Sequence, residues 1–195
     1  VAGAEFYAGE RLPENYRLKK GDELYSQDYH YTYLGRNKGG WHVHVKDNTK
    51  AEYGPLLSEI AGKPLTDMAW TFSKCSSLTT APVIPSNVTN MDHTFWDCTS
   101  LTTAPTISNR VTSMYYTFNG CTKLTTAPTI PNSVTNMEST FRNCTSLTGT
   151  IEINANPTDC YFCFMGTVKP ITLTGSSTKL TEFATTSTSG NVTVK

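Results

Sequence analysis

Residues 124–144 read LTTAPTIPNSVTNMESTFRNC, and the same pattern occurs with few changes at residues 78–98 and 101–121, a spacing of 23 residues. Four columns of identical residues extend through four copies: Met68, Met91, Met114, Met137; Phe72, Phe95, Phe118, Phe141; Cys75, Cys98, Cys121, Cys144; and Leu78, Leu101, Leu124, Leu147. A fixed period of about 20 to 50 residues is the signature of a solenoid, whose units bury their apolar faces by stacking. The sequence therefore predicts a repeat solenoid.

Each repeat divides into two arms of different character. Met68, Thr71, Phe72 and Cys75 are spaced i, i+3, i+4 and i+7, which predicts a short helical or 3₁₀ turn. Residues 78–85 contain two prolines and β-branched residues, which favours a short strand. We therefore expect short parallel strands on one side of the solenoid and helical turns on the other.

The pattern of residues 124–144 resembles the BspA-like leucine-rich repeat of bacterial surface proteins. The resemblance covers roughly two thirds of the chain and includes seven columns. It implies a curved leucine-rich-repeat solenoid that is exported to the bacterial surface, or secreted, and used for adhesion or recognition. It implies no catalytic residues.

Length and charge agree with a small non-catalytic protein. The 195 residues suffice for one elongated domain or two small ones, and 16 basic residues balance 16 acidic ones. A neutral chain lacks the basic field that nucleic acid or an anionic membrane attracts. No apolar run approaches the roughly 20 residues needed for a membrane span, and no signal peptide is apparent at Val1. We expect no nucleic-acid partner, no membrane insertion of this segment and no cofactor.

The six cysteines allow two interpretations. An even number in an exported protein suggests disulfides, and Cys160 and Cys163 form a C-x-x-C that can hold zinc or do redox chemistry. However, four cysteines occupy one repeat column, and Cys160 and Cys163 lie 23 residues after Met137 and Thr140. We therefore predict six free, buried cysteines that pack as small hydrophobes. In the four-residue column, serine should destabilise more than alanine, because its buried hydroxyl would need a partner.

Before the repeats, two alternating segments predict a β-hairpin with an aromatic face. Tyr29, Tyr31 and Tyr33 alternate with polar residues, and Trp41, Val43 and Val45 do the same after the glycine-rich residues 35–40. If Tyr33 pairs with Trp41, His30 lies opposite His44, and His42 shares their face. Three histidines on one face can bind a metal, but a solvated outer face is the simpler interpretation. We expect the Tyr/Trp face to pack on the first coil.

The pattern divides the chain into three parts. Residues 1–48 form an N-terminal β-hairpin region after an irregular lead-in, and residues 49–64 form a capping helix and linker, with Leu56 and Ile60 covering the first coil. Residues 65–195 form the solenoid. Its last two copies are degenerate: Ile153, Phe164, Leu180 and Phe183 keep the register, and residues 171–173 and 192–194 alternate as strands.

Candidate binding residues are those that vary between copies, because the constant columns are occupied with packing. Two residues after each methionine position stand Trp70, His93, Tyr116, Ser139 and Phe162, with Tyr115, Tyr161 and Trp96 beside them. Exposed aromatic rings at coil spacing can bind a sugar face or an apolar patch of a partner. The alternative is that these rings only pack on one another as an outer skin. Repeated threonines such as Thr79 and Thr80 can order water or ice, but cross-strand stabilisation is the simpler explanation.

No catalytic motif appears outside the repeat register, so we predict that the protein is not an enzyme. Our leading hypothesis is a secreted or cell-surface adhesion module that recognises a host or microbial protein or glycan through the variable aromatic positions. The alternative is a non-binding structural spacer in an envelope or phage-type assembly.

Overall fold

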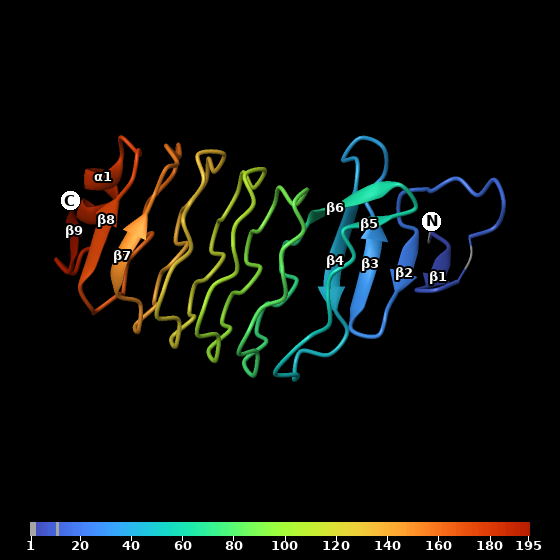
Figure 1. Ribbon diagram of the computed structural model, residues 1–195, viewed down its shortest axis with the longest axis horizontal. Coiled ribbons are helices and arrows are strands. Elements are labelled where there is room, and N and C mark those ends of the chain that lie inside the picture. Colours follow the sequence, from blue (N-terminus) through green and yellow to red (C-terminus); the bar gives the residue numbers. More distant parts are fainter. Residues whose placement is uncertain (1–2, 11) are drawn as a thin grey trace.

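In the computed structural model, which describes residues 3–10 and 12–195, like residues of successive coils stack on one another. The phenylalanine ladder is the clearest case: Phe95 and Phe118 lie 5.4 Å apart with rings inclined by 5°, and Phe118 and Phe141 lie 5.5 Å apart at 3°. The methionine, cysteine and leucine columns are also fully buried. The molecule is a β-solenoid of about nine turns (Figure 1), which confirms the predicted fold class.

The arm that begins at each methionine is not a helix, which corrects the prediction. The N–H groups of Met68, Trp70 and Phe72 donate to carbonyls of the next coil over 2.9–3.0 Å instead of to their own arm. Single turns lie between these bonds, and φ is positive at Trp70 (62°) and at Lys74 (59°). A residue in the left-handed region interrupts the right-handed helical path, so single turns follow one another without forming a helix. Met68, Phe72 and Cys75 still point inside.

The proline-containing arm has no continuous strand either. Between residues 68 and 148 the coils are joined by isolated parallel bridges at a spacing of 23 residues, such as Thr80 to Thr103 and Asn90 to Ser113. Threonine adds to this ladder, because Thr125 donates from both its N–H and its hydroxyl to the carbonyl of Thr102, over 3.1 and 3.2 Å. The threonines therefore stabilise the stacking of coils, as the simpler interpretation predicted.

A six-stranded sheet covers the first coil. It contains β1 (Glu5–Tyr7), β2 (Glu23–Tyr25), β3 (Tyr29–Tyr33), β4 (Trp41–Val45), β5 (Glu59–Ile60) and β6 (Lys63–Asp67), in the order β1-β2-β3-β4-β6-β5. The predicted hairpin is confirmed: Tyr33 pairs with Trp41, and His30 pairs with His44. The residues before it are not an irregular lead-in throughout, since β1 pairs in parallel with β2. Residues 1, 2 and 11 of the predicted lead-in lie outside the described residues.

The aromatic face of this hairpin packs on the first coil, as predicted. The ring of Tyr29 meets the edge of Phe72 at 6.1 Å, and the hydroxyl of Thr71 donates to the carbonyl of Val43 over 2.8 Å. One buried apolar cluster extends from Leu24 to Val192. The N-terminal sheet and the solenoid therefore share a continuous core.

The predicted capping helix over residues 49–64 is wrong. Its second half forms the antiparallel pair β5–β6, joined by Ala61 and Gly62, which both have positive φ (50° and 72°). Two consecutive residues of positive φ form the tight turn that matches the twist of a hairpin. Ile60 is buried and its carbonyl accepts a hydrogen bond from the indole N–H of Trp41 over 3.0 Å, so capping comes from a hairpin.

The C-terminal end closes with a small parallel sheet and one helix. β7 (Gly149–Glu152), β8 (Ile171–Thr174) and β9 (Val192–Val194) pair in that order, which confirms the two predicted strands. Helix α1 (Leu180–Thr185) was not foreseen; its Phe183 packs edge-on against Phe164 and ends the phenylalanine ladder. Among residues 3–10 and 12–195, no helix has the length and apolar character that crossing a bilayer requires.

Candidate functional aromatic cluster

The variable aromatic residues of the first three coils come together on one surface. Trp70 and His93 are stacked at 3.8 Å with an angle of 8°, and His93 and Tyr116 at 5.1 Å with the same angle. Trp96 stands perpendicular to Trp70 at 5.7 Å, and Tyr115 stands perpendicular to His93 at 5.2 Å. These five residues, which we call the aromatic cluster, form a ring stack with perpendicular rings beside it.

Ser139 interrupts the column, so Tyr161 and Phe162 form a separate pair. Their ring centroids lie 6.4 Å apart, and the guanidinium of Arg142 lies 5.9 Å from the centre of the Phe162 ring. Ser139 itself is fully buried and its hydroxyl has no hydrogen-bond partner among the described residues. The candidate residues therefore occupy two patches, not one continuous column.

Every residue of this column has a left-handed backbone. The φ angles are 62° at Trp70, 54° at His93, 56° at Tyr116, 54° at Ser139 and 55° at Phe162. This conformation costs an L-amino acid about 1–2 kcal/mol, and glycine adopts it freely. The repeat uses this conformation at a point where the chain reverses its hydrogen bonding. Trp70, His93 and Tyr116 donate their own N–H to the next coil over 2.9–3.0 Å, whereas the N–H that follows each of them donates back to the methionine carbonyl of its own coil. The aromatic identity of these residues is not explained by the backbone.

The rings of the cluster are partly exposed and carry no charge, and one carboxylate and one ammonium group lie beside them. Trp70 is 44% exposed, while the other four rings are half-buried. Burial lowers the pKa of His93, and the charge of Asp92 opposes this only in part, so the imidazole is neutral at pH 7. The ammonium of Lys74 lies 5.0 Å from the centre of the Trp96 ring, a cation–π contact that sequence reasoning missed. A neutral stack of this kind suits an apolar or planar ligand.

The histidines of the N-terminal hairpin do not converge on a metal site. His30 faces Glu23, with Nε2 3.2 Å from a carboxylate oxygen, and His42 faces Asp67 at 3.6 Å. His44 contacts the carbonyl of Val45 through Nδ1 at 2.9 Å. Within the described part of the chain, no group of three or more His, Cys, Asp or Glu side chains is arranged to hold a metal.

The cysteines are free and buried, which confirms the predicted packing role. Burial raises the pKa of each thiol, to about 11 for Cys75 and about 12 for Cys160, which suppresses the nucleophilic thiolate. Inside the column, Cys98, Cys121 and Cys144 donate to carbonyls of the preceding coil; the Cys121 sulfur lies 3.1 Å from the oxygen of Phe95. A serine hydroxyl in this column would therefore have a carbonyl acceptor within reach, so from the structure we expect serine to destabilise less than alanine, in contrast to the expectation from sequence.

Shallow apolar hollows lie on the proline arms. One is lined by Pro82, Val83, Ile84 and Pro105, and a second lies between Tyr53, Leu56 and Val83. Neither contains a titratable group apart from the Tyr53 phenol. These hollows therefore add no catalytic candidate.

Comparison with known proteins agrees with the repeat pattern. A family model for the BspA type leucine rich repeat region matches residues 68–172 in six copies, a range that covers the four strict copies and continues into the degenerate region, ending before Leu180 and Phe183. No curated protein and no solved structure gave a match.

Proposed function

Because the chain belongs to the BspA type leucine rich repeat family, we propose that it is a secreted or cell-surface adhesion module of a bacterium, which binds a protein or glycan through its aromatic cluster. The family is one of protein-interaction and surface modules, and its solenoid fold is typically non-enzymatic. The adhesive role, the bacterial surface location and the host or microbial partner are parts of the proposal.

The observation that carries this proposal is the choice of residues at the left-handed position. Three successive coils place Trp70, His93 and Tyr116 there, although glycine would relieve the backbone strain. Ser139 stands at the same position, so the fold does not require a ring at it. Selection for a ring at this strained, partly exposed position is what a binding surface would produce.

The arrangement also suits binding energetically. Tryptophan and tyrosine dominate the binding energy of many interfaces, because they bury a large area with few rotatable bonds. Here Trp96 and Tyr115 hold the stacked rings from the side. The rings are therefore already ordered before binding, which reduces the entropy lost when a ligand is bound.

The test uses the triple variant Trp70→Ala, Trp96→Ala, Tyr116→Ala with Val83→Ala as the control. Val83 is 86% exposed and lies on the proline arm, so its removal changes apolar surface away from the cluster. Beads coated with each protein are applied to arrays of glycans and of extracellular matrix and microbial surface proteins. We expect the wild type and Val83→Ala to bind the same ligand, and the triple variant to lose at least tenfold in affinity while it stays folded.

Two results would refute the proposal. If the triple variant binds as tightly as the wild type, the cluster is not the binding surface. If the wild type binds nothing on any array, the continuous stack from the N-terminal sheet to α1 is better explained as a spacer.

A further inference from the structure

The outer face of the N-terminal sheet carries two rows of side chains that the core does not use. Along β1 to β4 the inward residues, such as Leu24, Tyr31 and Val43, are buried, and the residues between them face outward. Strand register places the outward residues in two rows: Tyr7, Tyr25, His30 and His44 in the first, and Glu5, Glu23, Thr32 and His42 in the second. This face is separate from the aromatic cluster.

The first row is a line of neighbouring rings. Tyr7 and Tyr25 lie 5.6 Å apart with their rings inclined by 31°, and Tyr25 and His30 are stacked at 4.5 Å with an angle of 11°. Tyr7, at the outer end of the row, is 54% exposed. The row therefore presents aromatic surface to the solvent near the free edge of β1.

Carboxylates surround these rings. Glu23 accepts a hydrogen bond from the hydroxyl of Tyr25 over 3.1 Å, and Glu10 accepts one from the N–H of Tyr7 over 3.3 Å. Burial is the largest cause that raises the pKa of Tyr25, followed by the hydrogen bond and charge of Glu23 and then the charge of Glu5. The charges of Glu23 and Glu5 therefore act on the ring of Tyr25, and Glu23 also faces the imidazole of His30 at 3.2 Å.

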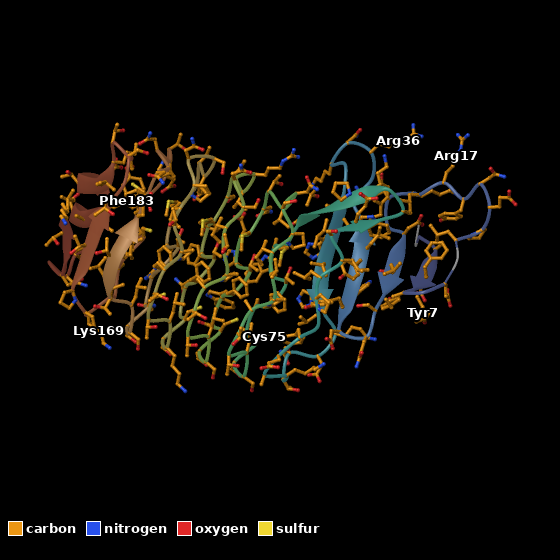
Figure 2. All side chains as sticks on the ribbon, viewed as in Figure 1. Tyr7, Arg17, Arg36, Cys75, Lys169 and Phe183 are labelled. Atoms are coloured by element: carbon orange, nitrogen blue, oxygen red, sulfur yellow. The ribbon has the colours of Figure 1, made fainter. Side chains whose placement is uncertain are left out.

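The lysines and arginines in the described part of the chain, residues 3–10 and 12–195, form no ion pair with Glu5, Glu10 or Glu23. Figure 2 shows Arg17 and Arg36 at the edge of this end of the molecule opposite to Tyr7. Both arginines line a hollow with Lys63, at the end of β3 and the start of β6.

We propose that this outer face binds an arginine- or lysine-bearing segment of a protein partner. Carboxylates attract the cation, and the ring faces of Tyr7 and Tyr25 hold it by cation–π contact, which is strongest with the planar guanidinium of arginine. The charge of the face is complementary to that partner and repels nucleic acid. β4 pairs with β6, and Asp67 bridges to Asn90 of the first repeat, so the same layer continues toward the aromatic cluster.

The probe is an acetylated and amidated hexapeptide of alternating glycine and arginine, and its control has citrulline, the neutral isostere, in place of arginine. Titration of the whole chain is followed by backbone amide chemical shifts in two-dimensional NMR. We expect the arginine peptide to shift the amides of Tyr7, Glu23, Tyr25 and His30, and its affinity to fall when salt is raised. The citrulline peptide should cause no such shifts.

Three variants locate the site. Glu23→Gln removes one charge at constant shape, and Tyr25→Leu removes the ring while keeping apolar bulk. Each substitution should lower the affinity for the arginine peptide about two- to fivefold, which is the effect of losing one exposed cation contact. Glu152→Gln, at an exposed carboxylate of β7 at the other end of the chain, should leave affinity unchanged.

Several results would overturn the proposal. Equal binding of the citrulline peptide would show that charge is not recognised. An equal loss of affinity in Glu152→Gln and Glu23→Gln would show that the peptide is attracted to acidic groups in general. Chemical-shift changes confined to other surfaces, or no binding at millimolar peptide, would show that the outer face is not a binding site. None of these outcomes decides whether the aromatic cluster binds a ligand, because the variants that test the cluster lie on the repeats.

Discussion

Replacing Phe118 by alanine tests the register on which the whole fold depends. Phe118 lies in a middle coil, is fully buried, and stacks on Phe95 at 5.4 Å and on Phe141 at 5.5 Å. The substitution removes one ring from an otherwise continuous ladder. Phe162→Ala is the matched control, because Phe162 carries the same side chain but is 42% exposed.

The expected magnitudes follow from burial. A buried phenylalanine replaced by alanine costs about 3–5 kcal/mol, and we expect the upper half of this range, since each stacked aromatic pair contributes about 0.5–1.5 kcal/mol beyond area burial. Full burial of a phenylalanine side chain stabilises a protein by about 1.5–3 kcal/mol, so replacing the half-exposed Phe162 by alanine should lower the free energy of unfolding by only about 1 kcal/mol. Alanine at position 162 has the same left-handed strain as phenylalanine, so the comparison concerns the rings.

The assay is equilibrium unfolding in guanidinium chloride, followed by circular dichroism. Wild type and both variants give a free energy of unfolding and an m-value. A reduced m-value for Phe118→Ala would indicate that coils on either side of the cavity unfold separately, as nearest-neighbour stacking allows. A loss below about 1 kcal/mol, or a loss equal to that of Phe162→Ala, would refute the stacked register.

Three further predictions test single contacts. Cys121→Ser should destabilise less than Cys121→Ala, because the serine hydroxyl can donate to the carbonyl of Phe95, and the reverse order would contradict this. The native thiols should react with Ellman's reagent only after unfolding, and a disulfide found by non-reducing mass spectrometry would contradict their packing as free cysteines. The hydrogen bond from Lys50 holds the pKa of Asp28 below its ordinary value of 3.8, so the stabilisation by this carboxylate is present above that pH and is lost as pH falls through the lowered pKa. Between about pH 4 and pH 2, the free energy of unfolding in urea should therefore depend less steeply on pH in Asp28→Asn than in the wild type. An equal pH dependence in the two proteins would be evidence against the ion pair. Gly120→Ala should cost more than about 1 kcal/mol in thermal unfolding, because φ is 77° and a Cβ there would collide with a carboxylate of the preceding coil; a neutral effect would contradict the backbone path.

Periodicity alone identified the core and the residues that share a column. A strict repeat of 23 residues superimposes like positions, so Phe118 had to lie near Phe95 and Phe141 whatever the path of the backbone. The inner face of the hairpin was also readable, because strict alternation fixes it, and the structure shows the assumed pairing of Tyr33 with Trp41.

Local backbone geometry was not readable from the same pattern. Alternating right- and left-handed turns place Met68, Phe72 and Cys75 inside just as a helix would. The two backbone paths differ in the acceptors of alternate N–H groups, which lie in the next coil here and would lie in the same arm in a helix. The prediction of a helix over residues 49–64 was wrong for a related reason. Leucine and isoleucine spacing favoured a helix, but Ala61 and Gly62 reverse the chain, and pairing with β4 favours a strand.

The sequence by itself determined which aromatic residues share a column, since register along the chain sets that. The tertiary structure decided that Trp96 and Tyr115 stand perpendicular to the stack, that Ser139 divides the column, and that Glu5, Glu23 and Tyr25 share an outer face. Ring orientation depends on rotamers chosen against neighbouring coils, and β1 meets β2 through pairing between residues about 18 positions apart. Neither of these leaves a periodic trace in the sequence.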